Sequence, residues 1–234
     1  MIHPSVAALE AVFQAVRDQD LPLGERLRLI SDCYQATAPL YAQAAQSLIE
    51  RLEAVNAGDG APRVGEVMPD FLMPDHDGRL IRLSELLDRG PVVLAFHRGH
   101  WCPYCRLNMS GLADIQQQVG PVQIAAISAE VQEYTRGLRD EARATFPFLS
   151  DVGAGYALSI DLAIWIDEKM SRMIDRTGWN IPSYQGGGGW ILPIPAVFVV
   201  RRDGTVAARH IDPDYRRRME LDDLLAAVDG VRAE

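Results

Sequence analysis

The sequence predicts an α/β protein with a mostly parallel sheet and a helical N-terminal extension. Short apolar runs recur at residues 92–96, 122–127 and 196–200, and each has the length of a strand that is buried on both faces. A helical pattern lies between the runs at 92–96 and 122–127, and another follows the second run. Strands joined by helices are typical of a parallel sheet covered on both faces. Residues 5–57 instead place apolar side chains at helical spacing, which indicates two or three helices before the first strand.

The N-terminal region, residues 1–57, is interpreted as a helical extension of a main domain that spans residues 64–234. The intervening residues 56–62, NAGDGAP, have the composition of a linker. Isolated amphipathic helices cannot keep their apolar faces in water, so we expect the extension to pack on the main domain or on a second copy in a homodimer. Cys33 lies on the flank of the apolar stripe, where a free cysteine most often packs as a small hydrophobe. A role as a resolving thiol stays open.

Beyond residue 64 the sequence predicts short strands, turns and helices. The turn DHDG separates two strands, and Ser84 has a residue type expected at the N-cap of a short helix. Residues 153–192 show no regular pattern, and the four consecutive glycines at 186–189 predict a mobile surface loop. The other predicted elements, in chain order, are strands at 71–73 and 80–83, a helix at 129–145, a strand at 206–211 and a closing helix around 221–228.

Two cysteines stand where the apolar strand 92–96 is followed by a helix. Pro103 suits the first helical position, which makes Cys102 the expected N-cap and places Cys105 in the first turn. The positive end of the helix dipole stabilises an anion there, and the thiolate is the reactive form of cysteine. The spacing therefore predicts a reactive dithiol.

Composition and charge argue against several classes of protein. The chain has 234 residues, of which 48% are hydrophobic, and a net charge of −9, which disfavours a general nucleic-acid or anionic-membrane binder. Its one basic cluster is at 216–218. No apolar run approaches the roughly 18 residues of a membrane span. Three cysteines are too few for a disulfide scaffold. We therefore expect a cytoplasmic protein without a nucleic-acid or membrane partner.

Four segments carry a resemblance to a known family. They are a hairpin segment at 64–87, FHRGHWCPYC at 96–105, FPFLSD at 146–151 and IPAVFVVRRDG at 194–204. In this order they resemble the peroxiredoxin-like branch of the alkyl hydroperoxide reductase and thiol-specific antioxidant superfamily. The resemblance covers about two thirds of the chain. It implies a thioredoxin-like fold, in which helices flank a central mixed sheet.

The resemblance also implies roles for individual residues. In peroxiredoxins a cysteine attacks the peroxide, and a threonine and a remote arginine hold the peroxide oxygens. Cys105 falls on the attacking position, and Cys102 replaces the threonine. Arg98 replaces a proline of the pattern, and Pro195 stands where the remote arginine would be. Trp101 before Cys102, together with Pro195, is similar to the thioredoxin arrangement, which implies that Trp101 and Pro195 bind the substrate. We accordingly expect a cis peptide bond before Pro195, facing Cys102.

The expected activity is a thiol-dependent antioxidant oxidoreductase that needs no cofactor. Attack of Cys105 on a peroxide, followed by condensation with Cys102, closes a disulfide that an external thiol must reduce. Attack by Cys102 on a protein or small-molecule disulfide is the alternative, and a redox-inert interaction module is the non-enzyme interpretation. We expect Arg98 to be the only guanidinium close to the two thiols. It either lowers a thiolate pKa, orients a peroxide or is a solvated loop charge.

The histidines near the cysteines raise the question of a zinc site. His97 and His100 are suitable zinc ligand types. However, His97 adjoins the end of a strand and the two cysteines begin a helix, so the four side chains meet at one point only if the loop between them folds back. We therefore expect no metal, and interpret His97 as a packing residue and His100 as a loop residue. Ser128, Glu130 and Asp151 follow strands, and both a supporting role at the site and turn capping are open for them.

Overall fold

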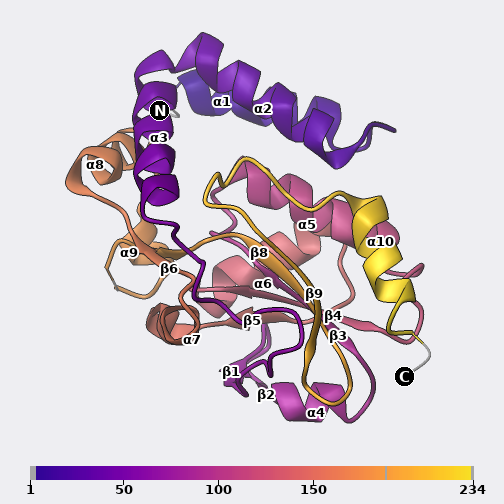
Figure 1. The fold of residues 1–234 in the computed structure, drawn as a ribbon. Helices are drawn as coiled ribbons and strands as arrows, with labels where there is room; N and C mark the ends of the chain where they lie inside the picture. Colours follow the sequence, from indigo (N-terminus) through magenta and orange to yellow (C-terminus); the bar gives the residue numbers. More distant parts are fainter. Residues whose placement is uncertain (1–3, 188, 233–234) are drawn as a thin grey trace.

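A five-stranded mixed sheet forms the centre of the computed structural model, which describes residues 4–187 and 189–232 (Figure 1). Its strands are β3 (Val92–Phe96), β4 (Gln123–Ser128), β5 (Phe148–Ser150), β8 (Ala196–Val200) and β9 (Val206–Ile211). The strand order is β5-β4-β3-β8-β9. The pairs β3–β4 and β4–β5 are parallel, and the pairs β3–β8 and β8–β9 are antiparallel.

The central mixed sheet implied by the family resemblance is confirmed, whereas the mostly parallel sheet expected from the apolar runs is wrong. β8 runs antiparallel to β3, with Ala196 opposite Phe96 and Val200 opposite Val92. A strand that is buried on both faces shows a continuous apolar run in either direction. The run at 196–200 therefore predicts the burial of this strand but not its direction.

Ten helices and four further strands surround or extend this sheet in the described part of the chain. The helices are α1 (Pro4–Val16), α2 (Leu23–Thr37), α3 (Pro39–Ala54), α4 (Leu83–Leu87), α5 (Pro103–Ile115), α6 (Gln132–Ala142), α7 (Gly155–Ser159), α8 (Glu168–Arg176), α9 (Ile181–Tyr184) and α10 (Leu221–Asp229). The strands are β1 (Leu72–Pro74), β2 (Leu80–Arg82), β6 (Ala163–Trp165) and β7 (Ile191–Pro193), and a short 3-10 helix, η1, spans Val152–Ala154. None of the helices in the described ranges is long and apolar enough to span a membrane.

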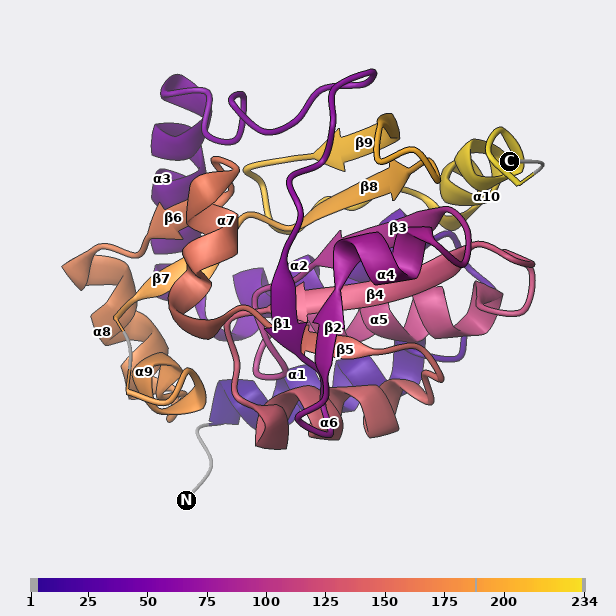
Figure 2. The same cartoon turned by 90° about the horizontal axis from the view of Figure 1, so that it is seen from below.

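The sheet is covered on both faces. Side chains alternate across a strand, so successive residues of β3 enter two different apolar cores. Val93 and Ala95 join one core together with side chains of α5, α6 and α10. Leu94 and Phe96 join a second core that also takes in the N-terminal helices and α4. Figure 2 shows β1 and β2 crossing beside β5, at the edge of the sheet.

The N-terminal helices pack on the rest of the molecule. Both α1 and α2 contact α5, and α3 contacts α8 (Figure 1). Buried residues of these helices, such as Phe13 and Leu48, belong to the same core as Phe96. The segment 56–62 is also held down, because the Arg209 guanidinium donates hydrogen bonds to the carbonyls of Ala61 and Pro62 at 2.6 and 3.1 Å. The extension is therefore positioned against the helix that carries Cys105.

The predicted N-cap at Ser84 is wrong. Helix α4 begins at Leu83, two residues before the start that an N-cap at Ser84 implies, and Arg82 stands at its N-cap without a side-chain hydrogen bond. The Ser84 hydroxyl and backbone N–H instead donate to the Asp70 carboxylate at 3.2 and 3.1 Å. An N-cap serine would accept a backbone N–H of the helix, whereas here Ser84 donates to an ionised carboxylate, and such charge-assisted hydrogen bonds are the stronger kind.

Residues 153–192 are more regular than the sequence predicted. They contain α7, β6, α8, α9 and the start of β7, and β6 pairs antiparallel with β7. These elements have three to nine residues, which is too short for a helical or strand period to stand out. The predicted mobility of residues 186–189 stays a prediction, because Gly188 lies outside the described residues; Gly186 and Gly187 have positive φ values of 76° and 96°.

Candidate active site

The two thiols lie at the start of α5, as the sequence predicted. Strand β3 ends at Phe96, five loop residues follow, and Cys102 is the N-cap of the helix with Pro103 at its first position. The Cys102 carbonyl accepts the N–H groups of Cys105 and Arg106, each at 3.0 Å. Both thiols are free and buried, with exposed fractions of 1% for Cys102 and 0% for Cys105.

The Cys105 sulfur has a surrounding that favours its anion. The backbone N–H of Arg98 donates to this sulfur at 3.3 Å, and Nη2 of Arg218 donates at 3.7 Å. Burial disfavours a charged Cys105, but the hydrogen bond from the Cys102 thiol and the positive charges of Arg218 and Arg98 outweigh it and lower the Cys105 pKa. Burial raises the pKa of Cys102, which also donates its proton toward Cys105. The pair therefore holds its negative charge on Cys105.

The expectation that Arg98 is the one guanidinium near the cysteines is wrong, because Arg218 also reaches the site. The segment between β9 and α10 carries Tyr215 and Arg218. Arg218 is buried, and its Nη1 donates to the carbonyls of Tyr215 and Arg217. The sequence did offer a signal, since this residue belongs to the chain's one basic cluster.

Arg98 is not a solvated loop charge. Its side chain is 1% exposed, and its guanidinium carbon lies 3.9 Å from the ring centre of Tyr215 and 4.8 Å from that of Trp101. Stacking on aromatic faces stabilises a buried guanidinium. The charge is thus fixed within the electrostatic reach of Cys105.

The loop before Cys102 is anchored by Glu130. The backbone N–H of His100 donates to Glu130 Oε2 at 2.8 Å, and burial raises the pKa of this carboxyl to about 8. Gly99 makes the close approach possible: it has φ of 142°, and a Cβ there would lie 2.5 Å from Glu130 Oε1 and 2.7 Å from Trp101 Nε1. Glu130 thus supports the loop, whereas Asp151 caps a turn by accepting the N–H groups of Tyr156 and Ala157.

The peptide bond before Pro195 is trans, which corrects the sequence-based prediction. None of the peptide bonds within the described ranges is cis. A tertiary X–Pro amide prefers trans by about 0.5–1 kcal/mol unless its surroundings demand otherwise. Ile194 is held by a hydrogen bond from its N–H to the Leu162 carbonyl at 2.7 Å, so a segment that the sequence left irregular determines the path of the chain before Pro195.

The two histidines face different surroundings. His97 is fully buried, edge-to-face with Phe148 at 5.8 Å, and burial followed by the Arg218 charge lowers its pKa to about 3. His100 Nε2 lies 3.0 Å from Glu141 Oε2. Over the described residues, no group of three or more histidine, cysteine or acidic side chains is arranged to hold a metal ion.

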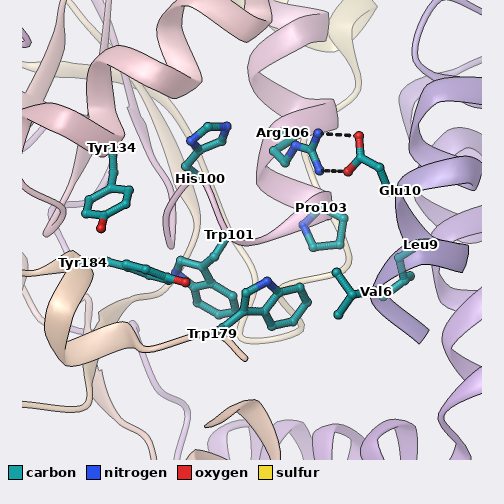
Figure 3. Close-up of a pocket in the computed structure, with 10 residues that line it drawn as sticks. All are labelled: Val6, Leu9, Glu10, His100, Trp101, Pro103, Arg106, Tyr134, Trp179 and Tyr184. Carbon is teal, nitrogen blue, oxygen red and sulfur yellow. Dashed lines mark hydrogen bonds and ion pairs between the residues drawn. The ribbon is translucent and has the colours of Figure 1, made fainter. Parts of the chain in front are cut away.

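Trp101 is buried and borders a pocket at the surface (Figure 3). Its ring centre lies 5.6 Å from that of Trp179, which comes from the segment between α8 and α9. Side chains of α1 line the opposite wall. The sequence singled out Trp101 but gave no reason to place Trp179 or the N-terminal helix beside it.

Comparisons with known proteins find relatives over part of the chain. Thiol-disulfide oxidoreductase ResA of Bacillus thuringiensis is 22% identical over 158 residues, 68% of this chain and 75% of that protein. Rv1608c of Mycobacterium tuberculosis, a protein provisionally named a peroxiredoxin, is 29% identical over 91 residues, 38% of this chain. The chain spans 59% of the length of that relative.

Solved structures place the same fold on most of the chain. The crystal structure of peroxidoxin BcpB from Mycobacterium tuberculosis matches 73% of this chain and 99% of its own, with a TM-score of 0.56 and 22% identity. The AhpC/TSA family matches residues 64–209, which include both cysteines of the candidate site. The chain belongs to the AhpC/TSA family and has a thioredoxin-like fold.

Proposed function

We propose that this protein is a thiol peroxidase in which Cys105 attacks the peroxide and Cys102 resolves the oxidised product. The observation that carries the proposal is the surrounding of the Cys105 sulfur, which receives the Arg98 N–H and lies beside the Arg218 guanidinium. A thiolate is the nucleophile in peroxide reduction, and these groups favour the thiolate on Cys105 rather than on Cys102.

The proposed cycle uses both thiols. The Cys105 thiolate attacks one oxygen of the O–O bond, which breaks; the second oxygen leaves as an alkoxide and takes a proton to become an alcohol. Cys105 is thereby oxidised to a sulfenic acid. The Cys102 thiol then attacks the Cys105 sulfur, a disulfide forms and water leaves. Two equivalents of an external thiol reduce the disulfide and are themselves oxidised to a disulfide.

Two arginines replace part of what the family pattern lacks. Cys102 stands where the pattern has a threonine, so a hydroxyl donor to the peroxide is missing. Arg218 supplies a guanidinium from the segment between β9 and α10, whereas the family pattern places the arginine at residue 195. Arg98 and Arg218 both stabilise negative charge at Cys105, and a fixed positive charge also favours the alkoxide that develops as the O–O bond breaks.

Disulfide exchange that begins at Cys102 is the second candidate. It is favoured by the position of Cys102 as the N-cap of α5 and by the likeness to a protein named a thiol-disulfide oxidoreductase. The raised pKa of Cys102 weighs against it, because this thiol keeps its proton while Cys105 loses one. A redox-inert interaction module is the third hypothesis, and titration of the two thiols distinguishes it from the peroxidase and disulfide-exchange hypotheses.

The experiment that tests the proposal compares oxidants on the reduced protein. Stopped-flow tryptophan fluorescence follows the oxidation of the reduced protein by hydrogen peroxide, an organic hydroperoxide and a model disulfide. Trp101, which directly precedes Cys102 in the chain, is the reporter. We expect both peroxides to react faster than the disulfide. Fast reaction with the disulfide alone supports the second candidate, and no fast reaction with any of the three supports the inert module.

We also propose that the protein is cytoplasmic and forms a homodimer. A reducing compartment keeps Cys102 and Cys105, both of which are free in the structure, available for the cycle. Leu40 and Val55, at the two ends of α3, are each 71% exposed and are candidates for a dimer contact. Analytical ultracentrifugation of the parent and of Leu40→Ser tests the dimer, which we expect the substitution to weaken.

A further inference from the structure

The pocket beside Trp101 is built by three parts of the chain that lie far apart in the sequence. Its volume is about 330 Å³, which is within the range of small-molecule sites. One wall is Trp101 and the start of α5, a second is α1 with Val6 and Leu9, and a third is the 153–192 segment with Trp179 (Figure 3). The extension and this segment are the two regions to which the proposed cycle assigns no role.

The walls of the pocket suit a flat, uncharged group. The rings of Trp101 and Trp179 lie 5.6 Å apart at 54°, and those of Tyr134 and Tyr184 lie 4.7 Å apart. Trp179 and Tyr184 are only partly buried, so a ligand from solvent can reach them. Figure 3 shows the aromatic side chains gathered on one side and Val6 and Leu9 on the other.

The charged residues of the pocket neutralise each other. Arg106 Nη1 and Nη2 donate to the Glu10 carboxylate at 2.6 and 3.1 Å, and Arg106 also pairs with Glu141. His100 contacts the same Glu141 carboxylate. An anionic ligand therefore finds no free cation among the lining residues. The chemistry of the walls favours an aromatic hydrocarbon over a carboxylate or a phosphate.

The pocket adjoins the start of α5, the helix that carries both thiols. Trp101 and Pro103 border the pocket and flank Cys102 in the chain, and the Trp101 ring also contacts the Arg98 guanidinium. Resting on the peroxidase function proposed above, we propose that the pocket binds the organic group of a hydroperoxide substrate and prefers an aromatic group next to the O–O bond. The extension and the 153–192 segment then determine substrate choice rather than the chemical step.

Three oxidants test this preference on the full chain. Cumene hydroperoxide carries an aromatic ring, tert-butyl hydroperoxide has the same tertiary carbon without the ring, and hydrogen peroxide has neither. Burying a ring against aromatic walls stabilises a complex enough for about a tenfold effect on kcat/KM. We expect kcat/KM for cumene hydroperoxide to exceed that for tert-butyl hydroperoxide by about tenfold or more.

Variants of two tryptophans locate the effect. Trp179→Ala is expected to lower kcat/KM for cumene hydroperoxide about tenfold more than it lowers that for hydrogen peroxide, and Trp179→Phe should restore most of the difference. Trp165→Ala is the matched control, since Trp165 is 66% exposed in β6 and does not line the pocket. Equal losses for all three oxidants in Trp179→Ala overturn the inference and leave the peroxidase function standing.

A binding measurement keeps the inference testable without turnover. In the Cys105→Ser background, titration calorimetry with 2-phenyl-2-propanol, the alcohol that cumene hydroperoxide yields, should show binding that Trp179→Ala weakens about tenfold. Unchanged affinity in the double variant overturns the pocket whatever the activity. If the protein consumes no peroxide but ligand binding still depends on Trp179, the proposed peroxidase function is wrong and the pocket is an aromatic-ligand site.

Discussion

Arg218 Nη2 lies 3.7 Å from the Cys105 sulfur, although 113 positions separate the two residues in the sequence. The guanidinium is buried and held by the carbonyls of Tyr215 and Arg217, so its charge cannot turn away to solvent. A fixed positive charge at this distance favours the thiolate. The relationship explains how a site that lacks an arginine at residue 195 can still stabilise an anion on Cys105.

The first prediction concerns this arginine. Arg218→Gln should raise the Cys105 pKa, because an opposite charge within reach of a thiolate is lost. Thiolate absorbance at 240 nm as a function of pH measures the change, and the rate with hydrogen peroxide at pH 7 should fall in parallel. Arg217→Gln is the control, because Arg217 has a 64% exposed side chain paired with Asp212 and Asp214. Equal shifts in both variants would contradict a specific role for Arg218.

The second prediction concerns pH and Glu130. Burial raises the pKa of this carboxyl from its ordinary 4.5 to about 8 in the folded protein. Its contribution to stability is therefore complete below about pH 4.5, declines as the pH rises, and is lost above pH 8. Urea unfolding from pH 5 to 8.5 should show the parent losing on the order of a few kcal/mol more than Glu130→Gln. Parallel curves for parent and variant would argue against a buried, neutral Glu130; Glu133→Gln, at an exposed position on α6, should follow the parent.

The third prediction concerns Gly99. Alanine at this position meets Glu130 and Trp101 as well as an unfavourable φ, whereas alanine at Gly65 meets only the unfavourable φ of 89°, with no atom within 4 Å. Gly65→Ala should cost about 1–2 kcal/mol from backbone strain alone. Gly99→Ala should cost about 1–3 kcal/mol more because of overpacking. Unfolding in urea measures both, and equal costs would show that the loop before Cys102 is not tightly packed.

The local arrangement of the thiols could be predicted from the sequence. The apolar strand at 92–96 and the proline at 103 determine where the strand ends and α5 begins, and both are short-range signals. The strands at 196–200 and 206–211 have the predicted bounds for the same reason. These elements bring Cys102 and Cys105 together because the two residues are only three positions apart.

Contacts between distant segments could not be predicted in this way. Arg218 reaches Cys105 because the chain turns back after β9, and no pattern within 212–220 encodes that path. The direction of β8 and the trans bond before Pro195 depend on tertiary packing in the same manner. Trp179 belongs to a segment whose elements are too short to show a period, so its place beside Trp101 had no sequence signal.

Single-turnover trapping shows directly whether Cys105 is the thiol that attacks peroxide. Reduced Cys102→Ser and Cys105→Ser proteins are mixed with one equivalent of hydrogen peroxide and dimedone, and intact-mass spectrometry counts the sulfenic acid adducts. We predict one adduct at Cys105 in Cys102→Ser and no peroxide consumption by Cys105→Ser. Peroxide consumption by Cys105→Ser, with an adduct at Cys102, would contradict it.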